Sequence, residues 1–175
     1  MHSVLLSSNQ TFVIGIVTFI YLNPEYCYSG ENLLNKAILY LFICLSIDME
    51  SKIKLGMVQV NNSFYKQNYL PLAIGFLQSY ATKNLEEIDK FEFLLPIYKR
   101  IPIDEAVNNL LEADIVFFSV YVWNKNISFE IAKKLKQKKP EAIIVVGGPQ
   151  IPDNNTEGFL RNHSFIDLVC HNEGE

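Results

Sequence analysis

The chain has 175 residues, about the size of one domain. Its 15 Lys and Arg against 19 Asp and Glu give a net charge of −4, so nothing predicts a nucleic-acid partner, which would need a clustered basic face. The three cysteines, Cys27, Cys44 and Cys170, fit neither a disulfide framework nor a CxxC metal site, and they favour a reducing, cytoplasmic location.

Residues 1–48 differ in character from the rest of the chain. They hold two apolar stretches, SVLLSSNQTFVIGIVTFIYL and AILYLFICLSI, and no Lys or Arg precedes Lys36, so the basic start of a secretory signal is absent. The first stretch reaches the length of a bilayer span only if its polar Ser-Ser-Asn-Gln cluster is included. Two interpretations stay open: a membrane anchor, or a non-native extension before a true start at Met49. We favour the second and divide the chain into residues 1–48 and 49–175.

From Ile53 onward, apolar β-branched runs alternate with segments of helical spacing. The first helix should place Leu70, Ile74, Leu77 and Ala81 on one face, and the second Ala106, Val107, Leu110 and Leu111. The spacing predicts strands at 53–60, 91–97, 114–122, 142–148 and 165–170, and helices at 69–84, 101–113, 128–140 and 156–163.

The alternation predicts the fold class. Continuous apolar strands such as DIVFFSVYV are typical of sheets covered on both faces. Right-handed crossovers then give an α/β fold with a doubly wound, five-stranded parallel sheet, flavodoxin-like and Rossmann-like. We expect no sixth strand from residues 1–48.

Ligands of such sheets bind beyond the carboxyl ends of the strands. Four loops there carry informative residues, namely NNSFYKQNYLP, SVYVWNKN, GGPQIPD and HNEGE, whereas YKRIP after the second strand reads as an ordinary exposed loop. Gly147-Gly148 either turns the chain or lets a flat ligand approach the backbone. The Ser119 hydroxyl either binds a ligand or satisfies a local carbonyl. Tyr121 and Trp123 should point to the same side.

Several chemistries lack their motifs. No GxGxxG follows the first strand, and no GxxxxGK[ST] occurs. A phospho-acceptor receiver domain would need acidic residues where this chain has Asn61-Asn62 and Ser119-Val120. No set of nucleophile, histidine and acid assembles from the sequence.

These loops resemble the amino-terminal cobalamin-binding domain of B12-dependent radical SAM enzymes, from about Lys52 to Glu175. YLPLAIGFLQSY is similar to that family's "LP…G-x-L-x-x-Y" helix, and SVYVWN to a strand-three signature of one branch. VVGGPQIPD followed by FLRNHSFIDLVCHNEGE is similar to "GGPQ-x-P…F-x-R…D…GEGE", with Asn172 in place of a glycine.

The resemblance implies cobalamin over the carboxyl edge of the sheet, with its nucleotide tail near Ser119 and Gly147-Gly148. The other B12 branch carries DxHxxG after strand one, but this loop holds no histidine, so no histidine should bind the lower face of cobalt. The implied cofactor-binding residues are Asn61, Ser63, Leu70, Pro71, Gly75, Ser119, Val120, Tyr121, Trp123, Asn124, Gly147, Gly148, Pro149, Gln150, Glu173, Gly174 and Glu175.

In that family a CxxxCxxC loop holds an iron–sulfur cluster in a barrel after the GEGE motif. The resemblance therefore places the cluster and S-adenosylmethionine in a domain downstream of Glu175. This chain is expected not to be catalytic alone and to serve methyl transfer in the full-length enzyme. Two rivals stay open: a flavodoxin-like module for another flat or phosphorylated ligand, and a membrane-tethered interaction protein.

Overall fold

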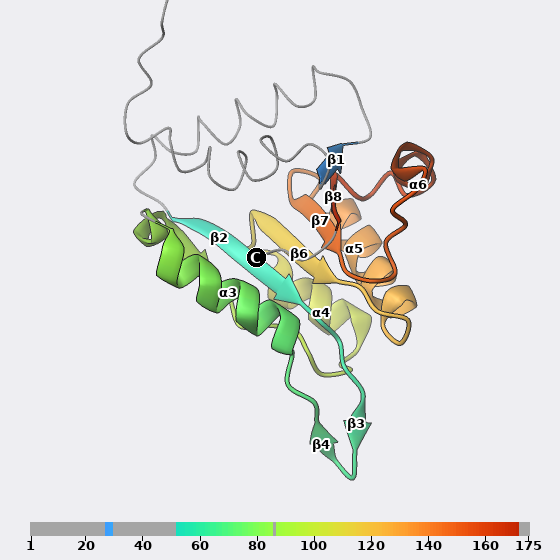
Figure 1. The fold of residues 1–175 in the computed structure, drawn as a ribbon. Coiled ribbons are helices and arrows are strands. Elements are labelled where there is room, and N and C mark those ends of the chain that lie inside the picture. Colours follow the sequence, from blue (N-terminus) through green and yellow to red (C-terminus); the bar gives the residue numbers. More distant parts are fainter. Residues whose placement is uncertain (1–26, 30–51, 86, 172–175) are drawn as a thin grey trace, which may run out of the picture.

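The computed structural model describes residues 27–29, 52–85 and 87–171, which form an α/β fold around one twisted sheet (Figure 1). Five parallel strands stand in the order β5-β2-β6-β7-β8. The predicted five-stranded parallel sheet is confirmed. The strands are β2 (Ile53–Val58), β5 (Phe91–Phe93), β6 (Ile115–Ser119), β7 (Ile143–Gly147) and β8 (Leu168–Cys170).

A sixth strand extends the sheet beyond β8. Strand β1 (Cys27–Ser29) pairs antiparallel with β8, so that Cys27 lies opposite Cys170. The expectation of no strand from residues 1–48 was wrong, because three residues are too few to show a period-two pattern. Both apolar stretches of that region lie outside the described residues. Within the described ranges, no helix has the length and apolarity needed to cross a membrane.

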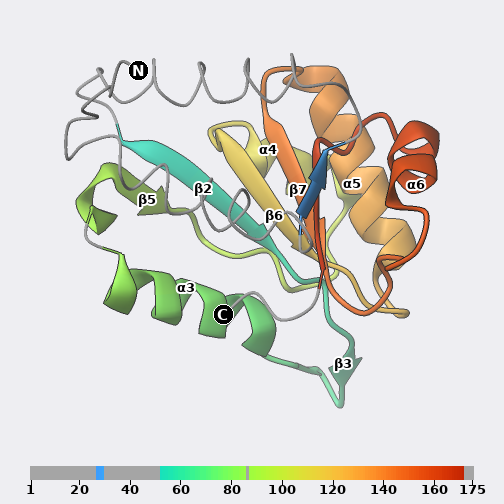
Figure 2. The ribbon, with the colours of Figure 1, turned by 45° about the horizontal axis from the view of Figure 1, so that its top comes forward.

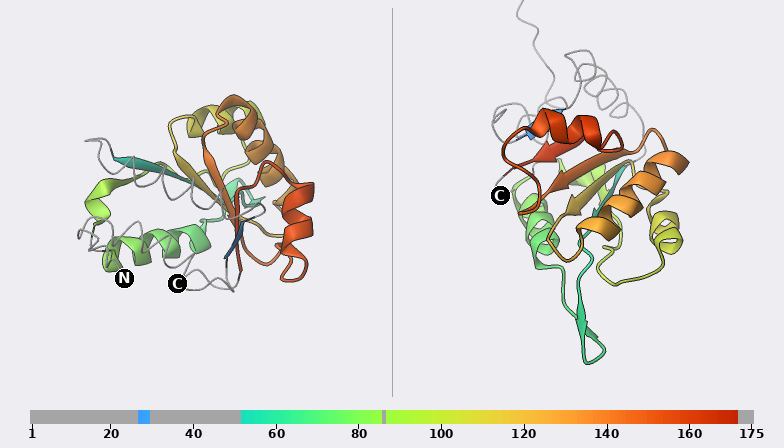
Figure 3. Two further views of the ribbon diagram at one scale, coloured as in Figure 1. Left: turned by 90° about the horizontal axis from the view of Figure 1, so that it is seen from above. Right: turned by 90° about the vertical axis from the view of Figure 1, so that its right-hand side faces the viewer.

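The four predicted helices are present, and they cover the sheet unequally. Figures 2 and 3 show α4 (Ile103–Leu110), α5 (Lys125–Lys138) and α6 (Thr156–Asn162) on one face, with α3 (Leu72–Asn84) on the other. The larger core joins α4, α5 and α6 to the sheet. It includes Val107, Leu110, Ile131, Leu135 and Leu160 against Val58, Val116, Ile144 and Val146.

Two predicted helix faces need correction. Helix α3 begins at Leu72, so Leu70 lies before it and is exposed, while Ile74 is the buried residue of that face. Leu111 follows the end of α4 and is partly exposed instead of lining it. The sequence also did not predict the 3-10 turn Ile88–Lys90, or the hairpin of β3 (Ser63–Phe64) and β4 (Gln67–Asn68) that projects from the end of β2 (Figure 1).

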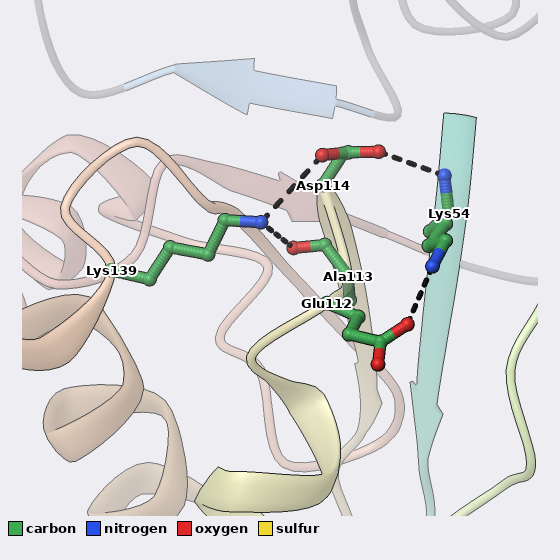
Figure 4. Close-up of polar contacts among 5 residues, drawn as sticks. All are labelled: Lys54, Glu112, Ala113, Asp114 and Lys139. Atoms are coloured by element: carbon green, nitrogen blue, oxygen red, sulfur yellow. Dashed lines mark hydrogen bonds and ion pairs between the residues drawn. The ribbon is translucent and has the colours of Figure 1, made fainter. Parts of the chain in front are cut away.

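Charged side chains tie the amino edge of the sheet together (Figure 4). Lys54 of β2 bonds to Glu112 through its ammonium group, and its backbone N–H donates to Asp114. Lys139, after α5, lies 3.6 Å from the Asp114 carboxylate and donates to the Ala113 carbonyl. The hydrogen bond to Glu112 raises the pKa of Lys54, and the same bond lowers the pKa of Glu112. This edge is opposite the one where a ligand is expected.

Candidate functional site

The strand order sets one switch point at the carboxyl edge. From β2 the chain passes to β5 on one side and then returns to β6 on the other. The loops that leave β2 and β6 therefore diverge, and an opening between them is where ligands of open α/β sheets bind. At this point the Trp123 indole N–H donates to Asn61 Oδ1 at 3.4 Å.

Two amides at the end of β2 fix the start of α3. Asn61 is 7% exposed, and its Nδ2 donates to the Leu70 carbonyl at 3.1 Å. Gln59 is equally buried and accepts from the backbone N–H of Ile74 at 3.3 Å. Gln59 was not among the predicted site residues, although a glutamine near the end of the apolar run IKLGMVQV was the available signal. Buried amides with these partners hold α3 against the sheet edge.

Asn124 shapes the loop after β6 from within. It is fully buried, its Oδ1 accepts from the Tyr121 N–H at 2.7 Å, and its Nδ2 donates to the Ser119 carbonyl at 3.0 Å. Its amide oxygen and nitrogen are thus both bonded within the turn. Its contribution is to fold the tight turn that presents the Tyr121 and Trp123 rings.

Those two rings stack with their centroids 4.6 Å apart and their planes 11° from parallel. The predicted orientation of Tyr121 and Trp123 to one side is therefore present. Trp123 is 42% exposed, which leaves a flat aromatic surface at the switch point. Offset aromatic pairs of this kind suit contact with another flat group.

The local backbone explains why a glycine occupies position 148. Its φ is +107°, and a Cβ there would lie 2.7 Å from the Val120 carbonyl oxygen. The loop after β7 is drawn onto the end of β6 by bonds from Val120 N–H to the Gly147 carbonyl, and from Gln150 N–H to the Val120 carbonyl. Val120 is fully buried, while Pro149 is exposed. Gly148 is thus required by the close approach of two loops.

The remaining predicted residues spread along the entry to α3. Ser63 lies on the exposed hairpin, and Pro71 precedes the helix, with its carbonyl accepting from the Gly75 N–H. A Cβ built at Gly75 would meet no atom within 4 Å. The helix is therefore open at this position, unlike the loop at Gly148.

His171 directly follows β8 at the carboxyl edge of the sheet, and its imidazole is turned inward. His171 Nε2 lies 3.1 Å from Thr156 Oγ1, His171 Nδ1 lies 3.4 Å from Asp153 Oδ1, and the side chain is 8% exposed. His163 Nδ1 lies 2.8 Å from the Phe159 carbonyl oxygen. The predicted Glu173, Gly174 and Glu175 lie outside the described residues. Within residues 27–29, 52–85 and 87–171, no group of His, Cys, Asp and Glu could hold a metal ion.

The loop after β5 also reaches the switch point. YKRIP was predicted to be an ordinary exposed loop, but its Arg100 donates to the Trp123 carbonyl at 2.7 Å. The available signal was topological, because β5 is parallel to β2 and ends at the same edge.

A separate hollow of about 780 Å³ lies against α4, between Leu94 and Glu112, and none of the predicted site residues lines it.

The chain is similar to two curated methyltransferases. It is 33% identical over 107 residues to "Cobalamin-dependent radical SAM methyltransferase TokK" of Streptomyces tokunonensis. It is 31% identical over 107 residues to "2-(S-pantetheinyl)-carbapenam-3-carboxylate methyltransferase" of Streptantibioticus cattleyicolor. Each match covers 61% of this chain but 16% of the relative, so the chain spans about a sixth of their length. No family model matches. The resemblance to B12-dependent radical SAM enzymes is confirmed by these relatives.

Proposed function

We propose that this chain is the cobalamin-binding module of a B12-dependent radical SAM enzyme that transfers methyl groups. The observation that carries the proposal is spatial. Three motifs of the resemblance, at Pro71–Gly75, Tyr121–Trp123 and Gly147-Gly148, come from separate parts of the chain, and all lie toward the carboxyl edge of the sheet. One of the two relatives is named as cobalamin-dependent.

The residues at this edge fit the group. A corrin is flat and carries neutral amides around its rim, so it needs a flat surface and neutral hydrogen-bonding partners. Trp123 and Tyr121 supply the flat surface, and Pro149 is exposed beside Gly148. Gly75 leaves room on the side of α3. Cobalamin, when bound, supplies a cobalt that can accept and donate a methyl group.

The chain's own residues bind and orient the cofactor. Asn61 and Gln59 fix α3 relative to the end of β2, and Asn124 fixes the turn that carries the aromatic pair. The contacts of His171 Nε2 with Thr156 and of His163 Nδ1 with the Phe159 carbonyl favour a cobalt without a histidine ligand. We propose that the iron–sulfur cluster, S-adenosylmethionine and the methyl acceptor are bound by other parts of the full-length protein.

The test is a titration of the 175-residue chain with hydroxocobalamin, followed by visible absorption. We expect saturable binding and a spectrum without a histidine ligand, unchanged in His171→Gln. A histidine-ligated spectrum that disappears in His171→Gln would contradict the absence of a histidine ligand. Failure of the folded chain to bind, together with saturable binding of a flavin such as FMN, would favour a flavodoxin-like module for another flat ligand.

A further inference from the structure

One guanidinium joins three loops at the switch point. Arg100 Nη2, from the loop after β5, donates to the Trp123 carbonyl at 2.7 Å and to Asn62 Oδ1 at 3.2 Å. Trp123 belongs to the loop after β6, and Asn62 to the loop after β2. The Asn61 N–H, next to Asn62, donates to the Tyr98 carbonyl at 2.8 Å, which holds the loops after β2 and β5 together through the backbone.

The bonds from Arg100 go to neutral oxygens. Among the ion pairs of the described residues, Arg100 takes part in none. A charged donor to a carbonyl forms a stronger bond than a neutral donor does. Both bonds use Nη2, which leaves the N–H groups of Nε and Nη1 for water or a ligand.

We propose that Arg100 is a positioning residue, which holds the Trp123 and Asn61-Asn62 loops in the arrangement that receives cobalamin. This inference rests on the proposed function. Arg100 and Asn62 are exposed, so water replaces their hydrogen bonds when the guanidinium is removed, and the core is not touched. The fold should therefore survive, while the loops gain freedom that cobalamin must then remove on binding.

The chain provides its own reporter and its own control. Trp123 is the only tryptophan, so its fluorescence reports on the loop that Arg100 holds. Arg161, on α6, bonds to Glu157 one turn earlier and lies away from the switch point. Arg161→Gln removes the same charge from the surface without touching these loops. Arg100→Lys keeps the charge but replaces the rigid, planar guanidinium, whose Nη2 bonds to both acceptors, with a flexible ammonium group.

The experiment measures three quantities in the full chain: acrylamide quenching of Trp123, the Kd for hydroxocobalamin, and the melting temperature. We expect Arg100→Gln to increase quenching and to raise Kd about tenfold, because pre-organisation is lost. The quenching and the Kd of Arg100→Lys should fall between those of wild type and Arg100→Gln. The quenching and the Kd of Arg161→Gln should match those of wild type. The melting temperature of Arg100→Gln should stay within a few degrees of wild type.

Two outcomes overturn the assignment while leaving cobalamin binding intact. In the first, wild type binds and Arg100→Gln keeps the same Kd and quenching. In the second, Arg100→Gln weakens binding no more than Arg161→Gln does. Absence of binding by folded wild type overturns the proposed function, and the positioning role with it, and the wild-type titration alone reveals that case.

Discussion

Helices α5 and α3 lie on opposite faces of the same sheet, and they use their apolar side chains differently (Figures 2 and 3). On α5, Ile131, Ala132 and Leu135 are almost fully buried. On α3 only Ile74 is buried, while Leu72 and Phe76, one turn apart, are 62% and 61% exposed. Among the described residues, α5 packs its apolar side chains into the core, whereas α3 leaves several of its own exposed.

The largest expected effect comes from the same substitution on the two helices. Leu135→Ala should lower the free energy of unfolding by about 2–5 kcal/mol, because it leaves a cavity beside α4 and the sheet. Leu72→Ala should change it by about 0.5 kcal/mol or less, since that side chain is mostly in solvent. Urea denaturation of both variants measures the difference. Similar losses would show that α3 stabilises the fold as much as α5 does.

A second test concerns the crowded loop at Gly148. Gly148→Ala places a Cβ against the Val120 backbone at a positive φ, so we expect a loss of about 1–3 kcal/mol in the free energy of unfolding. Gly147→Ala is the matched control, because its Cβ would lie 3.3 Å from the Cys170 carbonyl oxygen, a smaller misfit. Thermal melts of the two variants compare them. A Gly148→Ala variant as stable as Gly147→Ala would show that the two loops separate readily.

A third test concerns Gly75 on α3, where a small gain in stability is expected. Gly75→Ala should raise the free energy of unfolding by about 1 kcal/mol, because glycine is a poor helix former and the new Cβ meets no atom. Gly75→Leu should be at least as stable as wild type and yet bind hydroxocobalamin more weakly, if the corrin uses that space. Melts and titrations of the same samples separate the two effects. Undiminished binding by Gly75→Leu would place the cofactor away from this part of α3.

The sheet was predictable from the sequence because parallel strands buried on both faces leave long apolar runs such as DIVFFSVYV. The carboxyl edge was predictable because strand order and loop position follow from the alternation of elements. The roles of single residues at that edge were harder to predict from the sequence. Asn124 stays a predicted cofactor contact, and only the three-dimensional arrangement shows that its amide also bonds to Tyr121 and Ser119 within its own turn.

The role of Arg100 was not predicted from the sequence for a different reason. The bonds that give it a role reach residues 38 and 23 positions away in the chain, and no local pattern encodes such contacts. Strand β5 is also shorter than the predicted 91–97, since pairing with β2 ends at Phe93 and only the single bridge of Ile97 to Val58 follows. Propensity alone does not show where the pairing of two strands ends, because it depends on the neighbours of each strand.

The pairing of β1 with β8 has a consequence for the order of folding. Cys27 lies opposite Cys170, so forming this pair closes a loop of about 140 residues, with an entropic cost that grows with the logarithm of loop length. The parallel pairs β2–β6 and β6–β7 close shorter loops and bury apolar side chains as they form. We therefore expect β1 to join the sheet after the parallel strands have assembled and to leave it first on unfolding. Amide protons of β8 that β1 covers should then exchange with solvent sooner than those of β7.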